Sequence, residues 1–332
     1  MQTVETKAEE TLPKTPRRPV IDEYHGVKVV DDYRWLEDPN DPAVLQWVVE
    51  QNRYTRSVLD RIPVREQVHA RLRKLYDDTS PDYLSLQYRQ GVFFALKWAP
   101  PKNQRFLVTL RTVDDASSER TVVDPNKLDP RGATSIDFYV PSLDGRLVAI
   151  SLSRGGSEEG TVHVYEVATG RELTDFIPRV NYPTGGGSVA WNEDGSGFYY
   201  TRYPKAGERP AEDLGFYQQV YFHKLGIPSA EDTYVIGREF PRIAEVKLDT
   251  TEDGRYLLAV VANGDGGEFA HYLMDPDKHW TQVTEFSDQI TYASLGQDDC
   301  VYLLSRKDAP RGKILKLPLS SPQLDLAQPI VE

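Results

Sequence analysis

The spacing of apolar residues divides the chain into a short helical part and a long part made of strands. From Asp41, apolar residues recur every three or four positions, which predicts an amphipathic helix that ends near Arg61. Asp41 can cap this helix, and Pro42 suits its first position. The apolar residues between Val64 and Leu75 follow the same spacing and predict a second helix, which ends at about Tyr76.

Beyond Tyr76 the helical spacing disappears, and short apolar strands alternate with turns. A strand, an Asp-Gly turn and a second strand recur, and the turn aspartates lie 50, 59 and 45 residues apart, at Asp144, Asp194, Asp253 and, in a weaker copy, Asp298. A further strand is expected after each unit, at Thr161–Val167, Gln219–Leu225, Glu268–Met274 and Lys313–Leu319. This period is typical of the four-stranded blade of a β-propeller.

These patterns predict three segments. Residues 1–19 are polar and charged and are expected to form a disordered tail, and residues 20–76 are expected to form a helical arm. Residues 77–332 are expected to be all-β. An earlier, less regular unit at Val92–Trp98 and Arg105–Leu110 brings the number of blades to five, which is an incomplete ring.

Composition and charge narrow the class of protein. The net charge of −12 would repel nucleic acid and anionic lipid, so neither is expected as a partner. A single cysteine, Cys300, excludes an intrachain disulfide. The first twenty residues do not look like a signal peptide, and no apolar run approaches the length of a membrane span. A cytoplasmic, soluble protein is therefore expected, although a leader that had been removed would leave the same sequence.

The segment Tyr24–Pro39, which reads YHGVKVVDDYRWLEDP, resembles the opening signature of the prolyl oligopeptidase family of serine peptidases. Further stretches that resemble the family lie at 195–204, 217–226, 269–273 and 307–312. The resemblance implies an enzyme in which an α/β-hydrolase domain carries the Ser, Asp and His of a catalytic triad. It also implies a seven-bladed propeller that caps this domain and excludes large folded substrates, with the helical arm packed on the hydrolase side.

In this family the triad lies C-terminal to the propeller, so the resemblance implies that residues 1–332 lack the hydrolase domain and about two blades. The chain alone is therefore expected to be inactive. Residues 328–332 resemble the closing strand of a blade, and a gene fragment, a broken reading frame and a cut at a blade edge all remain open as reasons.

The residues themselves supply no catalytic constellation. A nucleophile elbow needs Gly-x-Ser-x-Gly between a strand and a helix, and no such sequence occurs. Ser188 comes nearest to it but is expected to enter a propeller strand. Asp275, Asp277 and His279 are close together, but their spacing is typical of a turn and not of a calcium loop. No catalytic residue, cofactor or metal is therefore predicted.

The three strand histidines are predicted to be hydrogen-bonded residues inside the blades, and His25 is expected to fix the arm. The strand histidines are His163, His223 and His271.

One residue is a candidate for substrate binding. Tyr182 occupies the place where the family carries an aromatic residue that reaches from the propeller toward the substrate, so the resemblance implies stacking upstream of the scissile proline. The alternative interpretation is an ordinary tyrosine at the edge of a strand.

The resemblance implies two partners, short proline-containing peptides and the hydrolase domain. Two other functions stay open. One is the corresponding part of an oligopeptidase B-like enzyme, which cleaves after basic residues, and the Tyr-His-Gly-Val-Lys start at Tyr24 favours the prolyl branch over it. The other is a propeller that acts alone as a binding module.

Overall fold

The computed structural model describes residues 12–182 and 185–331. It divides the chain into two compact units, Met1–Thr79 and Ser80–Glu332. The predicted tail over residues 1–19 falls largely outside the described ranges. No helix of the described residues is long and apolar enough to cross a membrane.

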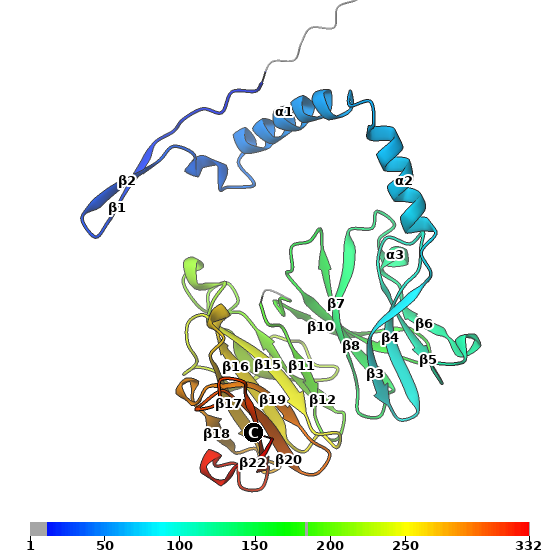
Figure 1. The fold of residues 1–332 in the computed structure, drawn as a ribbon, viewed down its shortest axis with the longest axis vertical. Coiled ribbons are helices and arrows are strands. Elements are labelled where there is room, and N and C mark those ends of the chain that lie inside the picture. Colours follow the sequence, from blue (N-terminus) through cyan, green and yellow to red (C-terminus); the bar gives the residue numbers. More distant parts are fainter. Residues whose placement is uncertain (1–11, 183–184, 332) are drawn as a thin grey trace, which may run out of the picture. The chain divides into compact units, whose positions relative to one another are not determined.

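The first unit contains a hairpin and two helices (Figure 1). The hairpin strands are β1 (Val20–Tyr24) and β2 (Val27–Asp31), and the helices are α1 (Pro42–Leu59) and α2 (Arg65–Asp77). The predicted cap of α1 is confirmed, because the Asp41 carboxylate accepts a hydrogen bond from the backbone N–H of Ala43 at 2.7 Å. Sequence analysis missed the hairpin. His25 and Gly26 both have positive φ, 52° and 80°, as a two-residue hairpin turn requires.

The second unit consists of five four-stranded antiparallel sheets in the described residues, and each sheet pairs its strands in chain order. The first two sheets are β3 (Asp82–Arg89), β4 (Val92–Trp98), β5 (Phe106–Leu110), β6 (Arg120–Val123), and β7 (Thr134–Pro141), β8 (Leu147–Arg154), β9 (Thr161–Glu166), β10 (Glu172–Pro178). The third is β11 (Val189–Trp191), β12 (Gly197–Arg202), β13 (Gln219–Lys224), β14 (Thr233–Ile236). The last two are β15 (Ala244–Thr250), β16 (Leu257–Asn263), β17 (Phe269–Met274), β18 (Trp280–Thr284), and β19 (Ile290–Leu295), β20 (Cys300–Ser305), β21 (Lys313–Pro318), β22 (Gln328–Val331).

The five predicted four-stranded units are therefore present, and each predicted third strand lies within one residue of an observed one. Short helical turns lie between some of these elements. They are η1 (Arg34–Leu36) in the first unit, and α3 (Pro125–Leu128), η2 (Ala116–Ser118), η3 (Ala211–Asp213), η4 (Gly264–Gly266), η5 (Phe286–Asp288) and η6 (Leu324–Leu326) in the second.

The recurring Asp-Gly turn joins the first and second strands of a sheet. The glycine alone takes the positive φ, which is 70° at Gly145 and 73° at Gly254. The aspartate contributes through its side chain. The Asp144 carboxylate accepts a hydrogen bond from the backbone N–H of Arg146 at 3.0 Å, and Asp253 repeats this with Arg255 at 3.1 Å. The carboxylate thus fixes the turn through an Asx-type hydrogen bond.

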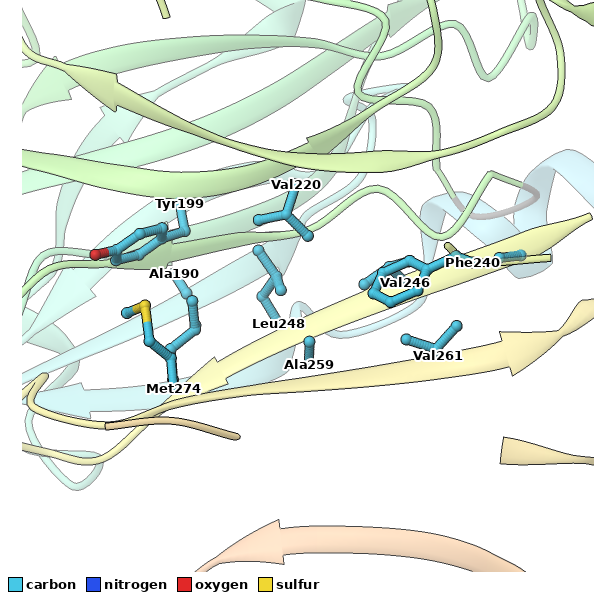
Figure 2. Close-up of a cluster of buried hydrophobic side chains, with 11 residues drawn as sticks. Ala190, Tyr199, Val220, Phe240, Val246, Leu248, Ala259, Val261 and Met274 are labelled. Atoms are coloured by element: carbon cyan, nitrogen blue, oxygen red, sulfur yellow. The ribbon is translucent and has the colours of Figure 1, made fainter. Parts of the chain in front are cut away.

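Consecutive sheets pack face to face through separate apolar clusters. The cluster between the third and fourth sheets contains eleven buried residues, of which nine are labelled in Figure 2. Leu248 and Val246 of β15 lie between Val220 and the β16 residues Ala259 and Val261. Because neither face of one small sheet can be buried alone, each blade depends on its neighbours for a core.

Candidate functional site

Tyr182 lies in the loop between β10 and β11 and is 37% exposed. Its ring meets that of Phe138 edge to face, with 5.3 Å between the ring centroids. Its backbone N–H donates to the carbonyl of Glu158 at 3.2 Å. The loop starts at Arg179, whose φ of 68° turns the chain away from β10. Tyr182 is thus an exposed aromatic side chain on a backbone held in place.

The glycines after Tyr182 allow the loop to lie tightly against its neighbours. A Cβ atom at Gly185 would come within 2.7 Å of the Cβ of Asn181 and within 2.8 Å of the Tyr203 ring. Gly186 has a φ of 59°, and a Cβ there would come within 2.9 Å of the Cβ of Glu245 in β15. Gly185 and Gly186 therefore lie close against the third and the fourth sheet.

Two buried polar side chains tie this loop to β15. Gln218 is fully buried, donates to the carbonyl of Gly185, and accepts from the backbone N–H of Val246 at 2.5 Å. The Ser188 hydroxyl accepts from the N–H of Leu248 at 2.9 Å. Ser188 enters β11 as predicted, where it links one sheet to the next. Sequence analysis could not predict these bonds, since 28 and 60 residues separate the partners.

Beside the Tyr182 loop lies a cavity of about 320 Å³, which we call the loop cavity. It is lined by Tyr203, Gly215, Phe216, Arg242, Ile243, Ala244, Glu245, Gly264 and Asp265. The Arg242 guanidinium stacks on the Phe216 ring at 3.5 Å from its centroid and pairs with Asp213 at 2.9 Å, so its charge is compensated. Burial and then the nearby Asp265 carboxylate raise the pKa of Glu245.

The loop cavity was not predicted. Its lining comes from three loops and from the start of β15, which the sheet order brings to one end of the third and fourth sheets. The only signal in the sequence is the aromatic and charged composition of those loops, and many exposed loops share it.

The three strand histidines lie inside the blades and are hydrogen-bonded. His163 Nδ1 lies 2.7 Å from Glu172. His223 lies between Asp175 and Asp232, at 3.0 and 2.7 Å.

His271 Nδ1 lies 2.7 Å from the Thr284 hydroxyl. None of the three histidines is part of the lining of the loop cavity.

Asp275, Asp277 and His279 form a turn between β17 and β18 in which their ligand atoms lie within 4.8 Å of one another. The Asp275 carboxylate accepts from the backbone N–H of His279 at 2.9 Å, as turn chemistry predicts. Asp277 and His279 are exposed. Exposed acidic groups are common without an ion, so this proximity alone does not define a metal site.

Comparison with known proteins defines the class to which the fold and the loops belong. The model of the prolyl oligopeptidase N-terminal β-propeller domain matches residues 13–332. A chain from a structural and mechanistic analysis of two prolyl endopeptidases superposes with a TM-score of 0.84 at 26% identity, covering 97% of this chain and 46% of that one. The second unit is therefore part of a β-propeller domain.

The chain belongs to the prolyl oligopeptidase family of serine peptidases, as its opening signature implied. It is 28% identical over 325 residues to a prolyl endopeptidase of Elizabethkingia meningoseptica, and the match covers 96% of this chain and 44% of the relative. It is 24% identical over 318 residues to Protease 2 of Moraxella lacunata, with 93% and 44% covered. The chain thus spans less than half the length of these relatives, in their propeller portion.

Proposed function

We propose that this chain is the substrate-gating propeller of a peptidase that hydrolyses short peptides after proline. The match to the propeller model over residues 13–332 carries the proposal. In a complete enzyme of this type a serine would attack the peptide carbonyl, a histidine would transfer the proton, and hydrogen-bond donors would hold the oxyanion. Residues 1–332 contain no Gly-x-Ser-x-Gly elbow. The propeller would therefore act by admitting and orienting peptides.

The first unit is proposed to pack on the hydrolase domain. Its helices expose apolar side chains, among them Leu45 at 54%, Val49 at 61% and Tyr76 at 62%. Exposed apolar residues at this density are typical of a surface that another domain covers.

Tyr182 is proposed to contact the substrate upstream of the scissile proline. Its exposed ring, the hydrogen bond from its backbone N–H to Glu158 and the adjoining loop cavity support this role. Aromatic rings are suited to it because they offer a large, stiff contact surface to a proline ring.

A peptide-binding measurement on residues 1–332 tests the role of Tyr182. We expect a fluorescent Gly-Phe-Pro peptide to bind weakly, and Tyr182→Ala to weaken the binding by about fivefold, since an aromatic contact contributes about 0.5–1.5 kcal/mol. Tyr88→Ala is the matched control, because Tyr88 is 54% exposed in β3, outside the loop cavity. Equal effects of the two substitutions would contradict the assignment of Tyr182.

Two further measurements test the gating function. Purified chain is expected to leave a proline reporter peptide intact, and cleavage that a serine-peptidase inhibitor blocks would overturn this expectation. Reading the genomic DNA after the codon for Glu332 is the second measurement. Two more blades followed by a Gly-x-Ser-x-Gly elbow would support gating, whereas a stop codon without such a sequence nearby would favour the stand-alone binding module.

A further inference from the structure

A cleft of about 340 Å³ lies between the first strands of the fourth and fifth sheets, and we call it the β15–β19 cleft. One wall is formed by Glu245, Lys247 and Asp249 of β15. The opposite wall and the floor are formed by Thr291, Tyr292, Ala293 and Ser294 of β19, by Leu258, Val260 and Ala262 of β16, and by Phe269 of β17, with Gly186 at one end. The cleft shares only Glu245 with the loop cavity.

Small side chains keep this cleft open. Ala262, Ala293 and Ser294 are part of its lining, so little side-chain volume projects at these three positions. The preceding sheet interface is packed differently, because the large residues Tyr199 and Phe240 lie in its cluster, as Figure 2 shows. The floor is nevertheless apolar, and it offers a hydrophobic surface of the size of one side chain or two.

β19 has one edge available for hydrogen bonding. It pairs with β20 alone, and within the described residues no other group bonds to the backbone of Tyr292–Ser294. The corresponding edge of β15 is occupied, since the N–H groups of Val246 and Leu248 donate to Gln218 and Ser188. An unpaired strand edge is a template for a further extended strand. The cleft therefore offers backbone pairing on its β19 side only.

The β15 side of the cleft is charged. Glu245, Lys247 and Asp249 alternate along the strand and line the cleft, and none of the three has an ion pair within the described residues. Among the residues that line the cleft, two carboxylates and one ammonium make this wall net negative, with the Arg89 guanidinium as a further cation near Asp249. Alternate residues of a strand lie about 6.6 Å apart, so the two carboxylates are separated by about 13 Å, the length of roughly four extended residues. A ligand with cationic groups at that spacing would complement both.

We propose that the β15–β19 cleft binds a short cationic peptide, extended along the free edge of β19, with an apolar side chain on the floor and its basic groups beside Glu245 and Asp249. The free edge of β19 favours an extended backbone, the apolar floor favours an apolar side chain, and the charged wall favours basic groups. The site adjoins the Tyr182 loop at Gly186, but Tyr182 is not part of its lining. It concerns binding only and does not rest on peptide cleavage, so it can fail while the gating function stands.

The test is calorimetric titration of residues 1–332 with the amidated pentapeptide Lys-Ala-Phe-Ala-Lys, whose lysines are four positions apart and lie on one face of an extended strand. Its acidic analogue Glu-Ala-Phe-Ala-Glu should bind at least tenfold more weakly. Two further analogues are methylated on the nitrogen of the phenylalanine or of the alanine that follows it, and one of the two should bind more weakly, because only alternate N–H groups face the β19 edge. Equal affinity for the basic and acidic peptides, or no heat of binding at millimolar peptide, would overturn the proposal, and unaffected binding of both N-methyl analogues would overturn the strand pairing.

Variants with opposite expected effects separate binding from damage to the fold. Glu245→Gln should lower the affinity for the basic peptide by about threefold, and Lys247→Met should raise it by about threefold, because partly exposed ion pairs have effects of this size. Ala293→Phe should abolish binding by filling the cleft. Glu193→Gln is the matched control, since it removes the same charge from an exposed turn outside the cleft. A loss of affinity in both charge variants would indicate disruption of β15 and would contradict the proposal.

Discussion

His223 and His271 are both fully buried, but their surroundings shift their pKa values in opposite directions. Each ring nitrogen of His223 lies within hydrogen-bond distance of a buried carboxylate, and ionised carboxylates only accept, so both nitrogens must carry hydrogen. Burial alone lowers the pKa of His223, but the bonds to Asp232 and Asp175 outweigh it and raise the pKa. His271 has one partner, Thr284, and no partner for Nε2 within the described residues, and burial lowers its pKa to about 4.

Replacing His223 should be strongly destabilising. His223→Gln would leave Asp175 and Asp232 buried without a cation between them, and breaking a buried charged group in this way costs about 3–5 kcal/mol of unfolding free energy. His163→Gln is the matched control and should cost less than about 1 kcal/mol, because its partner Glu172 is 46% exposed. Urea unfolding measures both. Similar losses of unfolding free energy in the two variants would contradict a larger stabilising effect of the buried network.

The two histidines should affect the pH dependence of stability with opposite signs. The pKa of His271 is about 4 in the folded protein and 6.5 in the unfolded chain. Its contribution to the unfolding free energy is therefore complete above pH 6.5 and is lost as the pH falls toward 4. The full effect is on the order of 3 kcal/mol. His223, whose folded pKa is raised, contributes fully below pH 6.5 and loses this contribution as the pH rises through its folded pKa.

Urea titrations between pH 4 and 7 test the His271 contribution. His271→Gln should flatten the rise of unfolding free energy with pH over this range, whatever its effect on stability at pH 7. An unchanged slope in the variant would mean that His271 takes up no proton on unfolding there.

The Asp-Gly turns repeat along the chain, but their surroundings differ, and the difference predicts unequal costs of substitution. Gly195 and Gly254 have φ values of 66° and 73°, so alanine at either should cost roughly 1–2 kcal/mol in backbone strain. A Cβ at Gly195 meets nothing within 4 Å, whereas one at Gly254 would lie 2.5 Å from Leu143 and 2.8 Å from the Cα of Glu193. Gly254→Ala should therefore lower the unfolding free energy by about 1–3 kcal/mol more than Gly195→Ala does. Thermal melting of the pair gives the comparison, and equal shifts would contradict it.

Periodicity predicted the repeating elements well because each is determined locally. The turn glycines, the helix cap at Asp41 and the third strand of each sheet depend on residues within a few positions of one another. What the sequence could not predict depends on distant residues. Nothing near Glu245 in the chain indicates that Asp265 and Phe216 line the same cavity. The candidate at Tyr182 came only from the family resemblance, and its role in binding stays a prediction.

At the scale of the whole molecule, the first unit should make the isolated chain prone to self-association. Leu45 and Val49 lie one turn apart on α1 and are more than half exposed. Replacing both by serine should weaken association in analytical ultracentrifugation by about tenfold or more, because each apolar side chain buried in a contact contributes about 1.5–3 kcal/mol. Val113→Ser, at a residue 58% exposed in the second unit, is the control. A monomer at all concentrations would contradict the expectation.

Every ladder of hydrogen bonds in the five sheets joins strands that follow one another in the chain. A blade thus has all its pairing partners once its own stretch of about 50 residues has left the ribosome, before any later blade exists. Pairing between neighbouring strands favours rapid folding within a blade, whereas the apolar faces between blades are buried only when the next blade has folded. Synthesis from the N-terminus can therefore assemble this propeller blade by blade, and the most recently made face is the one that a nascent chain leaves open to aggregation.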